Sequence, residues 1–250
     1  MPSVQSVTGA VQGVVPRPRR AYATRYTYEE FEAIPTCHAS AGYGNPTGTT
    51  GDVNILNTPG NKFEYHIKGT QTILAPVFDA NGLNIAMDQT NNDGVELTQG
   101  ITARSKSAFV VGADAFYLAV TMRLADVSGS DDCAVGFRAA AAYQANIDDY
   151  TDMAALNVIS GAIKIETILN NAATVTTDTT NAWADAATKT LKVIVQKSGA
   201  VTYEIDGVAP TVTAAFTFDS GDTVVPFLYF LHDADLMDTL YVQKWECGLL

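Results

Sequence analysis

Apolar and polar side chains alternate along much of the chain beyond residue 60. Phe63, Tyr65 and Ile67 alternate with polar residues, and a longer alternating run spans residues 116–124. A period of two places the apolar side chains on one face of an extended strand, which is typical of half-buried β-strands. The same pattern returns over residues 163–165, 191–195, 201–205, 224–231 and 240–247. The sequence therefore predicts an all-β protein.

Short polar segments separate these predicted strands. Asn170-Asn171, Lys197-Ser198-Gly199 and Asp206-Gly207 interrupt the alternation. They suit hairpin turns, because Gly and Asn reach positive φ at low cost. Short strands joined in this way are typical of two packed antiparallel sheets, so we expect an antiparallel β-sandwich.

Two segments depart from plain alternation. Residues 139–145 are mostly alanine, a good helix former, and they predict a short surface helix. Residues 174–180 are rich in threonine, whose β-branched side chain suits an exposed strand edge.

Charge excludes one class of function. The 250 residues include 15 Lys+Arg and 27 Asp+Glu, for a net charge of −12. Such acidity repels a phosphate backbone, so we expect no nucleic-acid binding. Charged residues make up only 17% of the chain, below the roughly 25% of average domains, which predicts an uncharged surface that a partner covers.

The chain also lacks the signals of membrane insertion and export. Its longest strongly apolar run, residues 224–231, is far shorter than the roughly 20 residues that span a bilayer. Residues 1–15 lack the basic cluster and apolar run of a secretion signal. Cys37, Cys133 and Cys247 are an odd number of distant cysteines, which predicts reduced thiols. We expect synthesis in a cytoplasm and no membrane partner.

The N-terminal segment differs in charge from the rest. Residues 1–28 carry four arginines and no acid, which leaves −16 for residues 29–250. Prolines and small residues there favour an extended conformation. We predict a basic arm over residues 1–35, a loop-rich segment with the first strands over 36–104, and a β-sandwich over 105–250. Guanidinium groups pair bidentately with carboxylates, so the arm is a candidate partner-binding element. Its binding residues are Arg17, Arg19, Arg20 and Arg25.

Residues 190–207 form a strand, a glycine turn, a strand and an Asp-Gly pair. This unit resembles the concanavalin-like and laminin-G-like jelly rolls. Residues 226–231 and 240–246, with Trp245-Glu246 near the end, are similar to the closing strands of that fold. The resemblance covers residues 105–250 and implies a jelly-roll sandwich, without implying an activity.

A second resemblance is carried by residues 82–89, 93–97, 136–138 and 245–248 together with the basic arm. These segments look like structural proteins of tailed-bacteriophage particles that carry such jelly rolls. Members of that group coat or cement the capsid, or form fibre and tail parts. The resemblance implies a virion protein that binds copies of itself, for instance as a trimer, and the major capsid protein.

Catalytic patterns are incomplete. In glycosidases with concanavalin-like folds, the catalytic strand resembles the motif Glu-x-Asp-x-x-Glu. Two of its carboxylates serve as nucleophile and as acid/base. Glu204-Ile205-Asp206 matches the first half, but Ala209 occupies the position of the second glutamate. Glu204 is better interpreted as a solvent-facing strand residue. We therefore expect no enzymatic activity, and a glycosidase is the third hypothesis after the two functions below.

Metal sites are also weakly indicated. Three acidic groups could offer oxygen ligands to Ca²⁺, but none matches the twelve-residue calcium loop. They are Asp131-Asp132, Asp148-Asp149 with Asp152, and His232-Asp233-Ala234-Asp235. We interpret them as hydrated turn residues and expect no cofactor, with a Ca²⁺ site as the alternative. His38, His66 and His232 lack zinc spacing, and nothing orders Cys37-His38 for catalysis.

The leading hypothesis is a non-enzymatic virion component, a capsid decoration or cementing protein. The alternative is a lectin-like module of a phage fibre or tail that binds glycans through aromatic platforms. The platform candidates are Tyr143, Asn146, Tyr150 and Trp183. Buried core positions are the ordinary alternative for such aromatic residues.

Overall fold

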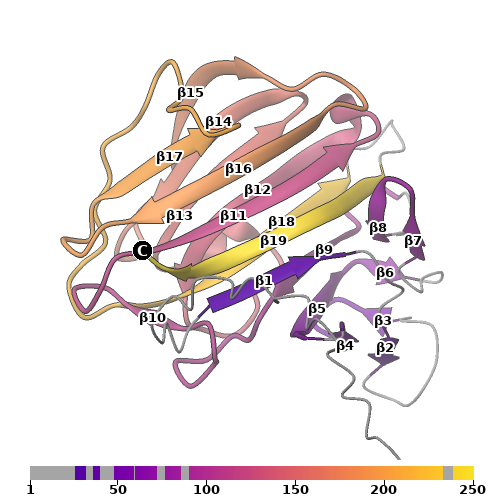
Figure 1. Cartoon of the computed structure of the whole chain (residues 1–250), viewed down its shortest axis with the longest axis horizontal. Helices are drawn as coiled ribbons and strands as arrows, with labels where there is room; N and C mark the ends of the chain where they lie inside the picture. The colour runs from indigo at the N-terminus through magenta and orange to yellow at the C-terminus, as the bar shows by residue number, and fades with distance from the viewer. Residues whose placement is uncertain are drawn as a thin grey trace, which may run out of the picture.

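Two large antiparallel sheets pack face to face as a β-sandwich (Figure 1). The computed structural model describes residues 26–31, 36–39, 48–58, 60–71, 77–85, 90–232 and 239–250. The prediction of an all-β antiparallel sandwich of the jelly-roll type is confirmed. Within these ranges, no helix is long and apolar enough to cross a bilayer.

The seven-stranded sheet is centred on β11 (Phe116–Leu124) and β19 (Leu240–Leu249). On one side it continues through β16 (Thr188–Val195) and β17 (Val201–Ile205). On the other side, β19 pairs first with β8 (Gly82–Ile85) and then with β1 (Tyr26–Glu30), and β7 (Val77–Asp79) follows β8. The C-terminal strand therefore holds the first described strand of the chain.

The ten-stranded sheet has β18 near its centre. Its order is β15 (Val175–Ala182), β14 (Ala162–Ile168), β13 (Met153–Ile159), β12 (Ser130–Ala139), β18 (Thr223–His232), β9 (Gly94–Thr98), β5 (Lys62–Lys68), β4 (Val53–Asn57) and β2 (Thr36–Ala39). The short β10 (Phe109–Val110) also pairs with β18, while β3 (Gly48–Thr49) and β6 (Thr70–Gln71) form a separate pair. Strands from before and after residue 105 thus share both sheets, and the predicted boundaries at 35 and 104 stay predictions.

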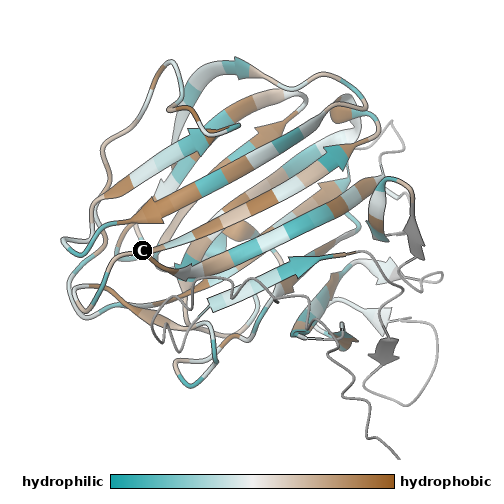
Figure 2. Ribbon diagram, viewed as in Figure 1, coloured by the Kyte–Doolittle hydropathy of each residue, from teal (hydrophilic) through white to brown (hydrophobic). Residues whose placement is uncertain are grey.

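The main core lies between the sheets, and alternation along the strands builds it (Figure 2). Trp245 of β19 packs edge-on against Phe63 of β5, with 5.5 Å between ring centroids. Phe109, Phe116 and Phe137 form a second aromatic contact across the core. Burying each such side chain contributes about 1.5–3 kcal/mol. Phe63, Tyr65 and Ile67 are all buried, as the alternation predicts.

A smaller apolar cluster covers part of the outer face of the ten-stranded sheet. Residues 140–152, which we call the covering segment, lie over this face and contribute Ile147 and Tyr150 to the cluster. The strands contribute Met153, Phe227 and Tyr229. The ten-stranded sheet is therefore buried on both faces at its centre.

The predicted helix over residues 139–145 is wrong. β12 continues through Ala139, and the nearest helical turn is the 3₁₀ helix η2 (Ile147–Asp149). The Ala139 amide donates to the Asp152 carbonyl and the Ala140 amide donates to the Thr223 carbonyl, at 2.8 Å each. Tertiary hydrogen bonds thus override the helix propensity of alanine.

The predicted turns and the predicted strand edge are confirmed. Asn170, Asn171, Gly199, Asp206 and Gly207 all have positive φ. The threonine-rich segment forms β15, the last strand on one side of the ten-stranded sheet.

Candidate functional site

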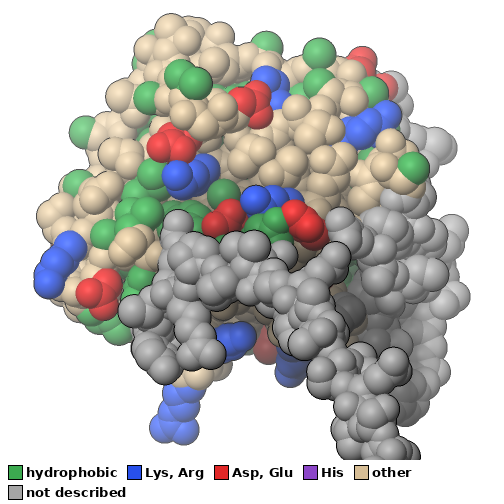
Figure 3. All heavy atoms as spheres, viewed as in Figure 1, with side chains coloured by type: hydrophobic (Ala, Val, Ile, Leu, Met, Phe, Trp, Pro, Cys, Tyr) green, Lys and Arg blue, Asp and Glu red, His purple; other side chains and the backbone are tan. Residues whose placement is uncertain are grey.

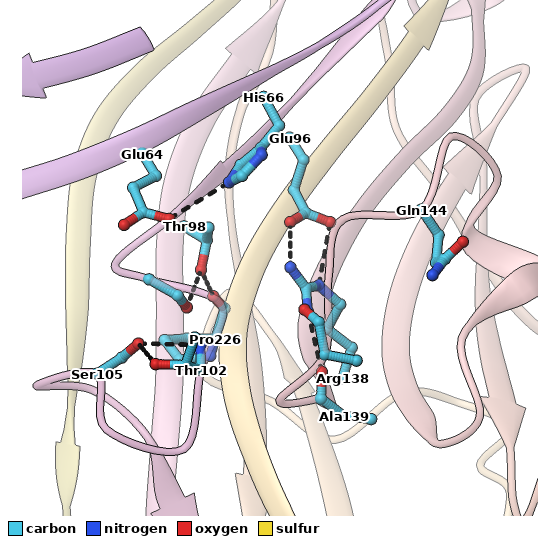
Figure 4. Close-up of polar contacts among 12 residues, drawn as sticks. Glu64, His66, Glu96, Thr98, Thr102, Ser105, Arg138, Ala139, Gln144 and Pro226 are labelled. Carbon is cyan, nitrogen blue, oxygen red and sulfur yellow. Dashed lines mark hydrogen bonds and ion pairs between the residues drawn. The ribbon is translucent and has the colours of Figure 1, made fainter. Parts of the chain in front are cut away.

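Polar side chains gather on the outer face of the ten-stranded sheet, around β5, β9 and β12. Alternation directs Glu64 and His66 of β5 to this face, opposite the buried Phe63 and Tyr65. In the β5–β9 register, His66 lies beside Glu96. Figure 4 shows these side chains together with Arg138 of β12. Two distinct arrangements result: a sealed ion pair and an open pocket.

The sealed ion pair joins Glu96 and Arg138, whose side chains are both fully buried. Arg138 donates from Nη2 to Glu96 Oε1 at 2.6 Å and from Nε to Oε2 at 3.1 Å. The Tyr150 hydroxyl donates to Glu96 Oε2 at 2.7 Å, and the guanidinium carbon lies 4.4 Å from the centroid of the Tyr150 ring. Arg138 Nη1 also donates to the carbonyls of Ala139 and Ala141. This bidentate, fully bonded pair anchors the covering segment.

Burial strengthens this network electrostatically. Burial acts to lower the pKa of Arg138, but the charge and hydrogen bond of Glu96, together with Tyr150 and Glu64, outweigh it and raise the pKa above its ordinary value. Burial and Glu96 together raise the pKa of Tyr150 well above its ordinary value, so this hydroxyl stays protonated and donates. Arg138 therefore stays charged and Tyr150 stays protonated at neutral pH.

The open pocket lies next to it, where β5 and the loop after β9 meet. It has a volume of about 550 Å³ and is lined by Gly60, Asn61, Lys62, Glu64, Gln99, Gly100, Ser105 and Lys106. The lining side chains are thus two amides, two ammonium groups, a carboxylate and a hydroxyl. Such a set suits a polar ligand with several hydrogen-bonding groups.

Glu64 and His66 connect the pocket to the sheet. His66 Nε2 lies 3.4 Å from Glu64 Oε2. This contact lowers the pKa of the Glu64 carboxyl, so Glu64 is ionised at neutral pH. The His66 side chain is only 1% exposed against 25% for Glu64, and its ring stacks on Tyr143 with 5.2 Å between centroids. Glu64 is therefore the accessible member of the pair.

The strand β1 braces one wall of the pocket. Asn61 Nδ2 donates to Glu29 Oε2 at 2.7 Å and to the Tyr28 carbonyl at 3.1 Å. The Thr58 hydroxyl donates to the same Glu29 oxygen at 2.6 Å. Glu29 thus fixes the turn that carries Asn61.

The opposite wall is a tight loop. Gly100 has φ +116°, and a Cβ there would lie 2.4 Å from Ser105 Oγ, so only glycine fits without a shift. The Thr102 amide donates to Ser105 Oγ at 3.1 Å. The Ser107 hydroxyl donates to Gln99 Oε1 at 2.7 Å, which leaves the Nε2 group of Gln99 as the donor available to a ligand.

The residues predicted as glycan platforms do not form an exposed aromatic surface. Tyr150 and Trp183 are 1% and 3% exposed, so neither offers a ring face to a sugar. Trp183 borders a shallow hollow beside Asp178 and Asn181, but its Nε1 group is directed to the Ala187 carbonyl at 3.0 Å. Tyr143 is half-buried against His66, and Asn146 caps η2. The four candidates therefore form no platform together.

The acidic groups serve as hydrogen-bond acceptors. Asn157 Nδ2 donates to both Asp132 and Glu166, at 2.6 and 2.8 Å. Asp148 accepts from the Thr174 hydroxyl, and Asp152 accepts from the Asn170 amide. Asp233 and Asp235 lie outside the described residues. Across the described ranges, no group of three or more His, Cys, Asp or Glu side chains is placed to hold a metal ion.

The remaining candidates are placed as follows. Glu204 pairs with Lys192 and Asp206 pairs with Lys189, each at 3.0 Å, as on a solvent-facing strand. Cys133 and Cys247 are buried free thiols. Arg17, Arg19, Arg20 and Arg25 lie outside the described residues, so the partner-binding arm stays a prediction. The described part of segment 1–35 begins at Tyr26 and pairs with the chain's own β19.

Sequence reasoning missed the pocket. Alternation correctly placed Glu64 and His66 on the face opposite the core, but it gave no sign that the loop after β9 approaches β5. The one available signal was Gln99-Gly100, a glycine two residues after the end of a strand, which marks a tight turn.

Comparison with known proteins extends the description of the fold. No protein-family model matches the chain, and no curated protein matches its sequence. Among solved structures, the chain is similar to a protein of unknown function from Shewanella oneidensis MR-1. The identity is 13% and the TM-score 0.51, over 90% of this chain and 86% of that chain. At this identity the likeness concerns the fold alone.

Two further likenesses are weaker. An alginate lyase from Pseudomonas aeruginosa has 10% identity and a TM-score of 0.47, over 69% of this chain and 85% of that chain. The potassium-bound carbohydrate recognition domain of Emp46p has 8% identity and a TM-score of 0.48, over 90% and 97%.

Fold and site together define the class: a jelly-roll β-sandwich with a polar pocket on the outer face of its larger sheet. The predicted jelly-roll β-sandwich is confirmed as the fold, and the virion role stays a prediction.

Proposed function

We propose that this protein binds carbohydrate, and that the saccharide occupies the pocket between β5 and the loop of residues 99–106. The polar lining of that pocket is the observation that carries the proposal. Its volume of about 550 Å³ lies within the range of small-molecule sites. A short oligosaccharide fits within such a volume, and its sugar rings carry hydroxyl groups on most of their carbon atoms.

The chemistry of the lining suits sugar hydroxyls. Each hydroxyl donates one hydrogen bond and accepts others, so it pairs with carboxylates and amides at once. Glu64 is an ionised acceptor, the Gln99 Nε2 group is a donor, and Asn61 is held in place by Glu29. Hydrogen bonds to a charged partner contribute more than neutral ones, so Glu64 is expected to contribute most.

Binding without turnover is what this lining supports. Hydrolysis of a glycoside in its common form needs two carboxylates on either side of the scissile bond. Glu64 is the single carboxylate among the residues that line the pocket. Glu96, on the neighbouring strand, is fully buried and committed to Arg138.

A glycan array tests this function. We expect the wild type to bind at least one oligosaccharide, and Glu64→Ala and Gln99→Ala to weaken that binding at least tenfold. Glu204→Ala is the matched control, because Glu204 lies on the outer face of the other sheet and pairs with Lys192. Since the pocket offers a single carboxylate, the same hits are expected with calcium and with a chelator. An array without hits would refute the proposal.

A virion building block is the second candidate function, and the outer face of the seven-stranded sheet supports it. In Figure 3 this face is mainly uncharged, with scattered acidic and basic groups. Tyr26 and Tyr28 of β1 are 39% and 37% exposed there, and among the described residues β1 pairs only with β19. Exposed aromatic side chains beside an open strand edge are features of protein interfaces.

In this second proposal, the protein decorates or cements a tailed-phage capsid. It binds neighbouring copies, for instance as a trimer, and the major capsid protein, with the basic arm lying across a neighbour. The two proposals are compatible, because a fibre or capsid protein can also bind glycans. Light scattering after size exclusion and co-sedimentation with empty capsids test it. A protein that stays monomeric at high concentration and does not bind capsids would contradict it.

A further inference from the structure

We infer that the pocket selects acidic saccharides, meaning sugars that carry carboxylate or sulfate groups; this inference rests on the carbohydrate-binding function proposed above. The pocket reverses the charge balance of the protein. The chain has 27 acidic and 15 basic residues, whereas the charged residues that line the pocket are Lys62, Lys106 and Glu64.

The two ammonium groups are available to a ligand. Lys62 and Lys106 are both exposed, and within the described ranges neither has an ion-pair partner. Lys189, Lys192 and Lys244, in contrast, each lie within 3.3 Å of a carboxylate oxygen. Carboxylates outnumber basic groups in this protein, yet Lys62 and Lys106 have no ion-pair partner within the described ranges. Their two ammonium groups are therefore suited to bind an anion.

The sequence around the pocket strengthens this local charge. From residue 97 to residue 113 the chain carries Arg104 and Lys106 and no acidic residue. A positive region within a negative surface attracts anions over roughly the Debye length, about 8 Å at physiological salt. Neutral sugars gain nothing from such a field.

Glu64 is compatible with an anionic ligand. The His66 contact lowers the pKa of Glu64, and the charges of Lys62 and Arg138 act in the same direction, so cationic side chains offset part of its negative charge. Glu64 lies on the His66 side of the pocket (Figure 4). We assign it to a sugar hydroxyl, while the acid group of the sugar lies at Lys62 and Lys106.

Paired probes test this inference. Each acidic oligosaccharide is measured beside a counterpart without the charge: oligogalacturonate beside its methyl ester, and sulfated galactan oligosaccharides beside their desulfated form. The first pair reports on carboxylate and the second on sulfate. Titration calorimetry at 50 and 300 mM NaCl gives the affinities.

We expect one acidic probe to bind at least tenfold tighter than its uncharged counterpart at low salt. The double variant Lys62→Met/Lys106→Met should lose about tenfold for the acidic probe, since an exposed ion pair contributes a factor of about 1.5 to 5. It should bind the uncharged counterpart as the wild type does. Arg104→Met removes one positive charge from the loop that carries Lys106, at a residue that does not line the pocket, and should change affinity less than twofold.

The outcomes separate the two proposals. Equal affinity within both pairs, or acidic binding unaffected by the double variant, would overturn the selection of acidic sugars and leave carbohydrate binding standing. Hits on the array that are all neutral glycans would have the same meaning. Absence of binding to every saccharide on the array and in the pairs would overturn both.

Discussion

The neighbouring strands β9 and β5 each direct a glutamate to the outer face of the ten-stranded sheet, but one glutamate is buried and the other is accessible. On β9, Glu96 is fully buried and is bonded to Arg138 and Tyr150 beneath the covering segment. On β5, Glu64 is partly exposed and faces a pocket whose lysines have no ion-pair partner among the described residues. The comparison teaches that burial, rather than residue type, separates a structural charge from a binding one. The following variants test each side.

The largest expected effect is on the sealed side. Arg138→Met leaves Glu96 buried without its partner, which should lower the free energy of unfolding by about 3–5 kcal/mol in urea denaturation. Adding Glu96→Leu to this variant should restore most of the lost free energy of unfolding, because the unpaired buried carboxylate is then gone. Arg123→Met is the control, since this half-buried arginine makes one carbonyl hydrogen bond, and it should lose less than about 1 kcal/mol. A loss below 1 kcal/mol for Arg138→Met would contradict the account.

A second effect concerns the half-buried Asp132 and the buried His232, which lie toward the end of β12 and β18 opposite to Arg138. Burial raises the pKa of Asp132 from 3.8 to about 6, and burial lowers the pKa of His232 from 6.5 to about 4. Between pH 6 and 4 the folded state binds more protons at Asp132, so this group adds stability as the pH falls. At His232 the unfolded state binds more protons, so stability is lost over about the same window.

The two contributions oppose each other, and single variants should expose them. Compared with the wild type, Asp132→Asn should be more stable at pH 7 by about 1–3 kcal/mol, and this advantage should vanish near pH 4. For His232→Phe, the advantage over the wild type should instead grow by about 1–3 kcal/mol as the pH falls from 7 to 4. Denaturation of the three proteins at several pH values measures both. Differences that do not change with pH would refute these assignments.

A third effect is on the pocket wall. Gly100→Ala imposes strain at φ +116° and a contact with Ser105, so it should lower the free energy of unfolding by about 1–3 kcal/mol and weaken saccharide binding. Gly207→Ala is the matched control, because Gly207 has φ +80° but nothing lies near its Cβ position. The control should lose a similar stability with unchanged affinity. Loss of affinity in both would show that general destabilisation is responsible.

The smallest stability effect is expected at Glu64. Glu64→Gln keeps the shape of a partly exposed side chain, so the free energy of unfolding should change by less than about 1 kcal/mol. Saccharide affinity should nevertheless fall several-fold, because the charged acceptor is lost. Thermal unfolding and calorimetry on the same sample measure both. A large loss of stability would place Glu64 on the structural side of the comparison.

Much of the fold follows from alternation, as β5 and β11 illustrate. The period of two fixed which side chains of β5 face the core and thereby placed Glu64 and His66 on the opposite face. The prediction of a helix over residues 139–145 was wrong, because the amides of this segment donate to the carbonyls of Asp152 and Thr223. These partners are brought near by the tertiary fold, and local sequence does not reveal them.

The site was less predictable than the fold. Tyr150 looked suitable as a glycan platform because nothing local indicates that the covering segment buries it against Glu96 and Arg138. Glu96 and Arg138 are 42 residues apart, and Glu64 and Lys106 meet only where two strands and a loop converge. Pattern reasoning reaches one strand at a time, whereas a pocket depends on the register between strands.

A crystal structure of the protein with the tightest-binding saccharide from the array would test the central claim most directly. The account predicts that the sugar lies between β5 and residues 99–106, with hydroxyl groups bonded to Glu64 and Gln99. A sugar bound elsewhere, such as the hollow beside Trp183, would contradict it.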